Sequence, residues 1–128
     1  MVYMEKVKLA LSSSEEKKLP SNIEAEQSLI GSVLVNNDII DEISNIINAG
    51  KFFDPIHRKI YEVIENLNNK GMIANPITLK NYFENDSGLA EVGGVDYLIK
   101  LTRFSSSIKQ AIDYAKIIHE MFVKRELI

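Results

Sequence analysis

Apolar residues recur along this chain at intervals of three and four, which is the spacing of one face of an α-helix. Within 21–34 the stripe consists of Leu29, Ile30, Val33 and Leu34. Ser21, followed three residues later by Glu24, predicts a capping box at the start of this helix. Gly31 interrupts the stripe. Because glycine costs about 1 kcal/mol in a helix, we expect another helix to pass close to it.

The same spacing predicts further helices, separated by residues that favour turns. The second stripe is expected to end with Gly50 as its C-cap, and it comprises Ile39, Ile40, Ile43, Ile46 and Ile47. Asp54-Pro55 and Asn75-Pro76 each place an N-cap residue before a proline at the first helical position. Gly71 is expected to end the third helix. The apolar residues of the third and fourth helices are Ile56, Ile60, Val63, Ile64 and Leu67, then Ile77, Leu79, Tyr82 and Phe83.

Gly93-Gly94 breaks the chain before a fifth helix, which is expected to end near Phe104. The last segment, 108–128, contains no helix breaker and predicts a helix of about 20 residues, or about 30 Å. Its apolar residues cover more than half of its circumference: Ala111, Ala115, Ile118 and Phe122 form one stripe, and Tyr114, Ile117, Met121 and Val123 extend it. Such a helix needs burial on two sides, so we expect one side to pack on its own domain and the other on a partner.

No stretch alternates with period two, so the predicted fold class is all-α. We expect a compact orthogonal bundle of about six helices with a long C-terminal helix. The predicted organisation is a flexible arm over 1–19, a globular helical head over 20–104, and the last helix over 105–128. The arm ends in charged and polar residues that bury too little surface to become ordered. The last helix shows no C-cap, which favours its continuation in a longer protein.

The composition limits the possible functions. The 128 residues carry 15 Lys and Arg against 18 Asp and Glu, so the chain lacks the broad positive charge that binds a phosphate backbone. There is no cysteine, which excludes disulfides and thiolate metal sites. No apolar run approaches the roughly 18 residues of a membrane span, and the charged start does not resemble a signal peptide. We therefore expect a cytoplasmic protein.

No motif in the chain predicts catalysis. The phosphate-binding loop pattern is absent, and His57 and His119 lack the spacing of a zinc site. We interpret both histidines as surface or partner-facing residues. Glu24 and Glu26 lie in the first turn of a helix, where the dipole favours negative charge, so capping explains them better than acid–base chemistry. We expect no catalytic, cofactor or metal site here, and the aromatic residues Phe52, Phe53, Tyr82, Phe83 and Tyr97 to belong to the core.

The motifs together resemble the N-terminal domain of DnaB-type bacterial replicative DNA helicases. The resemblance runs from Leu19 to Ile128, and its most specific part is the opening motif 20–28 with Gly31. Other matching positions are Phe52-Phe53, 57–61, 77–79, 92–94 with Tyr97-Leu98, 114–118 and 124–128. Asn75-Pro76 and Ser105-Ser106-Ser107 depart from the family pattern. The residues that we assign to the family signature are Ser21, Glu24, Glu26, Gln27, Gly31, His57, Gly93 and Gly94.

The resemblance implies a ring-shaped hexamer that unwinds duplex DNA 5′ to 3′. ATP and Mg²⁺ would bind, and DNA would mainly be contacted, in a RecA-like C-terminal domain outside this chain. The N-terminal domains would form a collar, pair through helical hairpins as a trimer of dimers, and receive primase and a helicase loader. The last helix would be the first arm of that hairpin, so the predicted interface is Tyr114, Ile117, Ile118, Met121 and Phe122. In this reading Glu24, Glu26 and Gln27 are capping and surface residues of a scaffold.

An alternative hypothesis does without an ATP-hydrolysing domain. In this hypothesis the chain is a stand-alone helical module that binds proteins or nucleic acid. Its nucleic-acid version requires an affinity that falls steeply with salt, because phosphate contacts release counterions. A third possibility is a small enzyme that uses His57, although no second catalytic group can be named beside that histidine.

Overall fold

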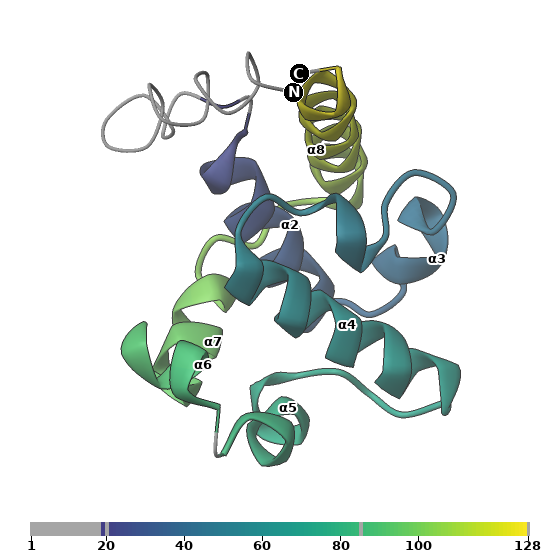
Figure 1. The fold of residues 1–128 in the computed structure, drawn as a ribbon. Coiled ribbons are helices and arrows are strands. Elements are labelled where there is room, and N and C mark those ends of the chain that lie inside the picture. Colours follow the sequence, from purple (N-terminus) through teal and green to yellow (C-terminus); the bar gives the residue numbers. More distant parts are fainter. Residues whose placement is uncertain (1–18, 20, 85, 128) are drawn as a thin grey trace, which may run out of the picture.

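The computed structural model describes residue 19 and residues 21–84 and 86–127, and these are helical without any strand. The predicted arm therefore lies outside the described residues, apart from Leu19. The elements, coloured along the chain in Figure 1, are α2 (Ile23–Val35), α3 (Ile39–Ile43), the 3₁₀ helix η2 (Ala49–Lys51), α4 (Pro55–Asn69), α5 (Pro76–Phe83), α6 (Ser87–Glu91), α7 (Val95–Thr102) and α8 (Ile108–Glu126). The all-α prediction is confirmed.

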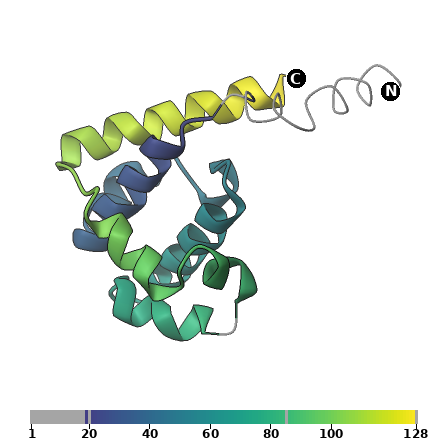
Figure 2. The same cartoon turned by 90° about the vertical axis from the view of Figure 1, so that its left-hand side faces the viewer.

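Helix α2 is the centre of the packing. It contacts α8 on one side and α7, α4 and α3 on the others. Two perpendicular views place α8 at one end of the molecule and α5 with α6 at the opposite end (Figures 1 and 2). The predicted stripe of α2 is fully inside, since Leu29, Ile30 and Val33 expose none of their surface.

Helix α8 packs on the rest of the domain with the stripe that its sequence predicted. Ala111, Ala115 and Ile118 belong to the same buried core as the apolar residues of α2 and α3. The first half of α8 is thus held by small side chains that allow close helix contact. The boundary between a head over 20–104 and a last helix over 105–128 stays a prediction.

Most of the predicted helix starts are confirmed. The Asp54 carboxylate accepts hydrogen bonds from the backbone N–H groups of Ile56, at 2.8 Å, and His57. The Asn75 side chain caps α5 in the same way and forms a capping box with Thr78. The hydroxyl of Ser107 accepts a hydrogen bond from the Gln110 N–H at 3.2 Å and so caps α8.

The predicted capping box of Ser21 and Glu24 is wrong by one residue. The N-cap of α2 is Asn22, whose side-chain oxygen accepts a hydrogen bond from the Ala25 N–H at 2.9 Å. Glu24 consequently occupies the second helical position instead of the third, and it cannot complete the box. Ser and Asn are comparably good N-cap residues, so the sequence alone does not decide whether Ser21 or Asn22 caps the start of α2.

Two further expectations are corrected. The second helix ends at Ile43, and the chain continues through turns into η2, which contains Gly50; Gly50 has no positive φ and is not a C-cap. Ser44 and Asn45, which favour turns over helix, follow Ile43 directly. The other correction concerns α5, where Ile77 is 79% and Tyr82 47% exposed although both were expected to face the core. A helix of two turns at the edge of the bundle buries only Leu79 and Phe83.

The close approach predicted at Gly31 is confirmed. A Cβ atom added to Gly31 would overlap the carbonyl oxygen of Leu101 and lie 2.8 Å from the Leu101 carbonyl carbon. Both are backbone atoms of α7, which cannot rotate away as a side chain would. Glycine at this position therefore allows α2 and α7 to touch.

We expect Gly31→Ala to lower the free energy of unfolding by about 1–3 kcal/mol, because the new methyl group forces two packed helices apart. Gly50→Ala is the matched control, since its nearest neighbour would be the movable Asn48 side-chain oxygen at 3.3 Å. Its effect should stay within about 0.5 kcal/mol. Urea denaturation followed by circular dichroism measures both. Equal stability of the two variants would contradict the close packing of α2 on α7.

Candidate functional site

A buried polar network joins three helices that are far apart in the sequence. Glu26 of α2 is 1% exposed and His57 of α4 is fully buried. One Glu26 carboxylate oxygen lies 2.8 Å from His57 Nδ1 and accepts a hydrogen bond from the Asp54 N–H at 3.2 Å. The other oxygen accepts from the Phe53 N–H at 2.7 Å. The carboxylate thus holds the start of α4 and its preceding connector against α2.

The network continues from His57 to α7. His57 Nε2 lies 2.6 Å from the hydroxyl of Tyr97, which in turn accepts a hydrogen bond from the Gln27 side-chain amide at 3.4 Å. Burial raises the pKa of the Tyr97 phenol, and the nearby carboxylates of Asp54 and Glu26 add to the rise. The phenol therefore keeps its proton. The two ring nitrogens of His57 thus each lie within hydrogen-bond distance of a partner, Glu26 on one side and the Tyr97 hydroxyl on the other.

The order carboxylate, imidazole, hydroxyl resembles the groups that activate a nucleophile in hydrolases. Here the raised pKa of Tyr97 opposes formation of the phenolate that such chemistry needs. Among the described residues, no buried side-chain nitrogen or oxygen is left without a hydrogen-bond partner. A fully satisfied network of this kind fixes the packing of α2, α4 and α7, so it is a structural centre.

The burial of both residues contradicts two expectations, namely that Glu26 is a capping or surface residue and that His57 is a surface or partner-facing residue. Both residues lie on the apolar stripe of their helix: Glu26 is in register with Ile30 and Val33, and His57 with Ile60 and Ile64. A polar residue on an apolar stripe is the signal that could have identified them. Glu24, by contrast, is exposed as expected.

Ser32 and two of the predicted signature residues, Gly93 and Gly94, also shape the packing. Ser32, next to Gly31, donates a hydrogen bond to the Ser28 carbonyl at 2.7 Å and accepts one from the Ser106 N–H at 2.9 Å, which ties the loop before α8 to α2. Gly93 and Gly94 have φ values of 114° and 63°, which other residues rarely adopt, and they separate α6 from α7 as predicted. Ser21 is half-buried and makes no cap.

The second half of α8 is fastened to the connector 46–53. The Lys51 ammonium donates hydrogen bonds to the Ile46 carbonyl at 2.9 Å and to His119 Nδ1 at 3.0 Å. The Arg125 guanidinium donates to the Lys51 carbonyl at 2.8 Å and lies 5.2 Å from the centre of the Phe53 ring. The connector that Glu26 holds from one side is thus held by α8 from the other.

The structure changes the list of predicted interface residues. Ile118 is 1% exposed and packs inside its own domain, so it is not available to a partner. The remaining four are half-buried: Tyr114, Ile117, Met121 and Phe122. Val123 and Leu127, which are not among those five residues, are 41% and 83% exposed. The interface itself stays a prediction.

The described part of the chain offers no cluster of three or more His, Cys, Asp or Glu side chains that could hold a metal ion. Across the same residues, no helix has the length and apolar character needed to cross a membrane.

Comparison with known proteins gives a consistent result. Residues 18–120 match the family described as the DnaB-like helicase N-terminal domain. The chain is 46% identical over 110 residues to the replicative DNA helicase DnaB of Rickettsia typhi, covering 86% of this chain and 22% of that protein. It is 36% identical over 112 residues to the DnaB of Pasteurella multocida, covering 85% and 23%. The chain thus spans about a fifth of the length of these curated relatives.

The fold is similar to a solved structure. The N-terminal domain of DnaB helicase from Mycobacterium tuberculosis superimposes with a TM-score of 0.77 and 29% sequence identity, covering 85% of this chain and 79% of that chain.

Glu26→Ala should lower the free energy of unfolding by about 3–5 kcal/mol, because it leaves the buried His57 ring and two partly buried backbone N–H groups without their acceptor. Glu24→Ala, in the same helical turn but exposed, should change it by less than about 0.5 kcal/mol. Chemical denaturation measures the pair. Similar losses in the two variants would show that the buried network does not stabilise the fold.

Proposed function

The chain belongs to the family of DnaB-like helicase N-terminal domains, and from this we propose that it is the collar domain of a cytoplasmic replicative DNA helicase. Its role is to assemble subunits and to receive other replication proteins. The chain spans about a fifth of the length of its relatives, 22% in the Rickettsia typhi protein, whose name describes a DNA helicase. The proposal assigns unwinding, ATP with Mg²⁺, and most DNA contact to a further domain of the parent protein.

The observation that carries the proposal is the contrast between the interior and the surface. The side chains of Glu26, His57 and Tyr97 lie within hydrogen-bond distance of one another, and in this way they join three helices of the domain itself. Apolar surface remains at the end of α8, where Val123 is 41% exposed and Leu127, which follows the helix, is 83% exposed. A rigid scaffold with apolar surface on a long helix suits assembly with other chains.

Self-association is proposed to use the outer face of α8. Tyr114, Ile117, Met121 and Phe122 are half-buried, so each side chain leaves part of its surface for a second copy. In the parent protein this pairing would build a trimer of dimers within the hexamer. Primase, and in addition a helicase loader, would dock on the assembled collar.

The domain should self-associate at high concentration in sedimentation velocity, and Met121→Lys should weaken this association about tenfold, because it places a charge on the apolar contact. Ile77→Lys is the matched control. Ile77 is 79% exposed on α5, at the end of the molecule opposite α8 (Figure 1), so this variant should associate like the original. Thermal unfolding checks that both variants are folded. A strict monomer at every concentration would count heavily against the α8 surface.

The domain should also bind the helicase-interacting domain of a cognate primase, with heat measurable by calorimetry. No heat above that of dilution would remove primase from the proposal while leaving self-association in place. Binding of single-stranded DNA that weakens steeply with added salt would instead favour a nucleic-acid-binding module.

A further inference from the structure

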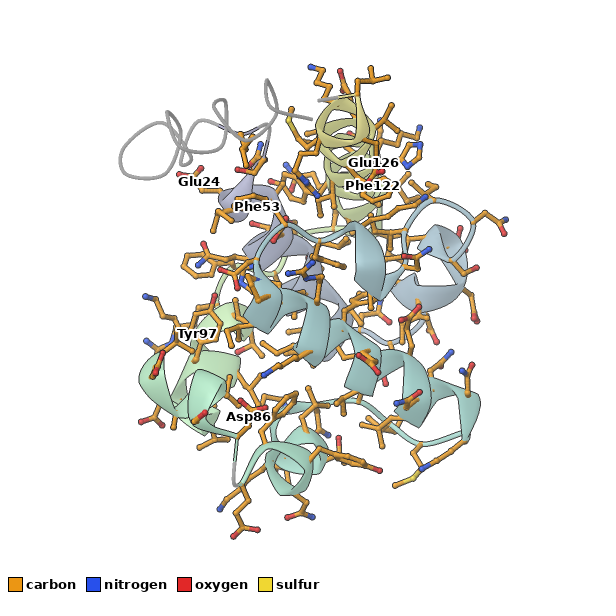
Figure 3. The ribbon with its side chains drawn as sticks, in the orientation of Figure 1. Glu24, Phe53, Asp86, Tyr97, Phe122 and Glu126 are labelled. Atoms are coloured by element: carbon orange, nitrogen blue, oxygen red, sulfur yellow. The ribbon has the colours of Figure 1, made fainter. Side chains whose placement is uncertain are left out.

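A cavity of about 280 Å³ opens where the connector 46–53, the start of α4 and the end of α8 meet. It lies outside the hydrogen-bond chain of Glu26, His57 and Tyr97, none of which lines it. Figure 3 labels three of its residues, Phe53, Phe122 and Glu126, which lie at the α8 end of the molecule. The other lining residues are Gly50, Phe52, Arg58 and Arg125.

Two guanidinium groups line this cavity, and the contacts of Arg125 fix its position. Arg125 stacks at 5.2 Å on the Phe53 ring and donates to the Lys51 carbonyl. Burial lowers the pKa of Arg125 and the neighbouring Arg58 adds to the lowering, whereas Glu26 and Glu126 act against it. The two positive charges are thus close enough to repel each other.

Arg58 supplies the accessible charge. It is exposed, and no carboxylate within the described residues forms an ion pair with it. Glu26 is close to Arg125 but is already bonded to the Phe53 N–H, the Asp54 N–H and His57. Among the described lining residues the charged ones are Arg58, Arg125 and Glu126, and Arg58 is the exposed cation of the three.

We propose that this cavity binds one acidic side chain of a protein partner, with the carboxylate between Arg58 and Arg125 and flanking apolar groups against Phe53 and Phe122. Guanidinium groups bind carboxylates in a matching planar geometry, and aromatic walls suit the apolar neighbours of that residue. The inference rests on the proposed function, since it names the chemistry by which a partner docks on this domain.

The charge and the size of the cavity favour a carboxylate over a nucleic acid. The single exposed cation Arg58 matches a monoanion, while Glu126 in the lining and the net charge of −3 disfavour a chain of phosphates. The volume of about 280 Å³ is near the lower end for ligand sites, which corresponds to one or two side chains.

The test is an NMR titration of the ¹⁵N-labelled 128-residue chain with two probes, the capped peptides acetyl-Leu-Glu-Leu-amide and acetyl-Leu-Gln-Leu-amide. The glutamate peptide should shift the backbone amides of Gly50, Phe53 and Glu126, and the glutamine peptide should bind about tenfold more weakly. Arg58→Gln should weaken binding of the glutamate peptide about tenfold. Lys109→Gln, which removes an exposed charge at the other end of α8, should leave it unchanged.

Three outcomes would overturn the proposal: equal binding of the two peptides, shifts away from the cavity, or the same loss in Lys109→Gln as in Arg58→Gln. Tighter binding of inorganic phosphate or of an eight-residue oligothymidine than of the glutamate peptide would assign the cavity to phosphate groups. Sedimentation of the same sample distinguishes failure of the cavity assignment from failure of the proposed function. A domain that self-associates but does not bind the peptide would refute the cavity assignment alone.

Discussion

The burial of one carboxylate constrains the rest of this fold. Removing Glu26 from water is costly unless its oxygens find donors, and a protein retains such a group only where the donors are held in place. Here the donors are two backbone N–H groups of the connector before α4 and the ring of His57. Tyr97 extends the same chain of hydrogen bonds to α7. The network therefore specifies how α2, α4 and α7 are oriented, which apolar contacts alone specify less sharply.

The other half of α2 brings α7 and α8 into place by different means. Gly31 removes a side chain so that the backbone of Leu101 can touch the helix, and Ser32 holds the loop that leads into α8. Residues along α2, among them the predicted signature residues Glu26, Gln27 and Gly31, thus determine how its neighbours pack. Glu26 and Gln27 act towards α4 and α7, while Gly31 and Ser32 act towards the end of α7 and the following loop.

The sequence predicted those features of the fold that depend on residues close together in the chain. Stripes of apolar residues, proline at the first helical position and paired glycines are local, and they located most of the helices. The role of His57 is different, because a polar residue on an apolar stripe is buried only if a partner exists, and its partners Glu26 and Tyr97 lie 31 and 40 residues away. The position of the α2 cap was missed because two adjacent capping residues compete, and the cavity beside Phe53 was missed because three separate segments form it.

The buried network and the outer cavity are mechanically connected, which gives the scaffold a direct part in binding. Phe53, whose N–H is bound by Glu26, forms a wall of the cavity, and Arg58 follows His57 in the first turns of α4. A connector without this anchor would have to be ordered by the partner itself, at a cost in affinity. Because the anchor is made inside the domain, Phe53 and the Arg125 guanidinium group stacked on it are positioned before any ligand arrives. Loss of the Glu26 carboxylate should therefore weaken binding of the acidic side chain in the cavity even in molecules that remain folded. The buried network thus contributes to binding without contacting the partner.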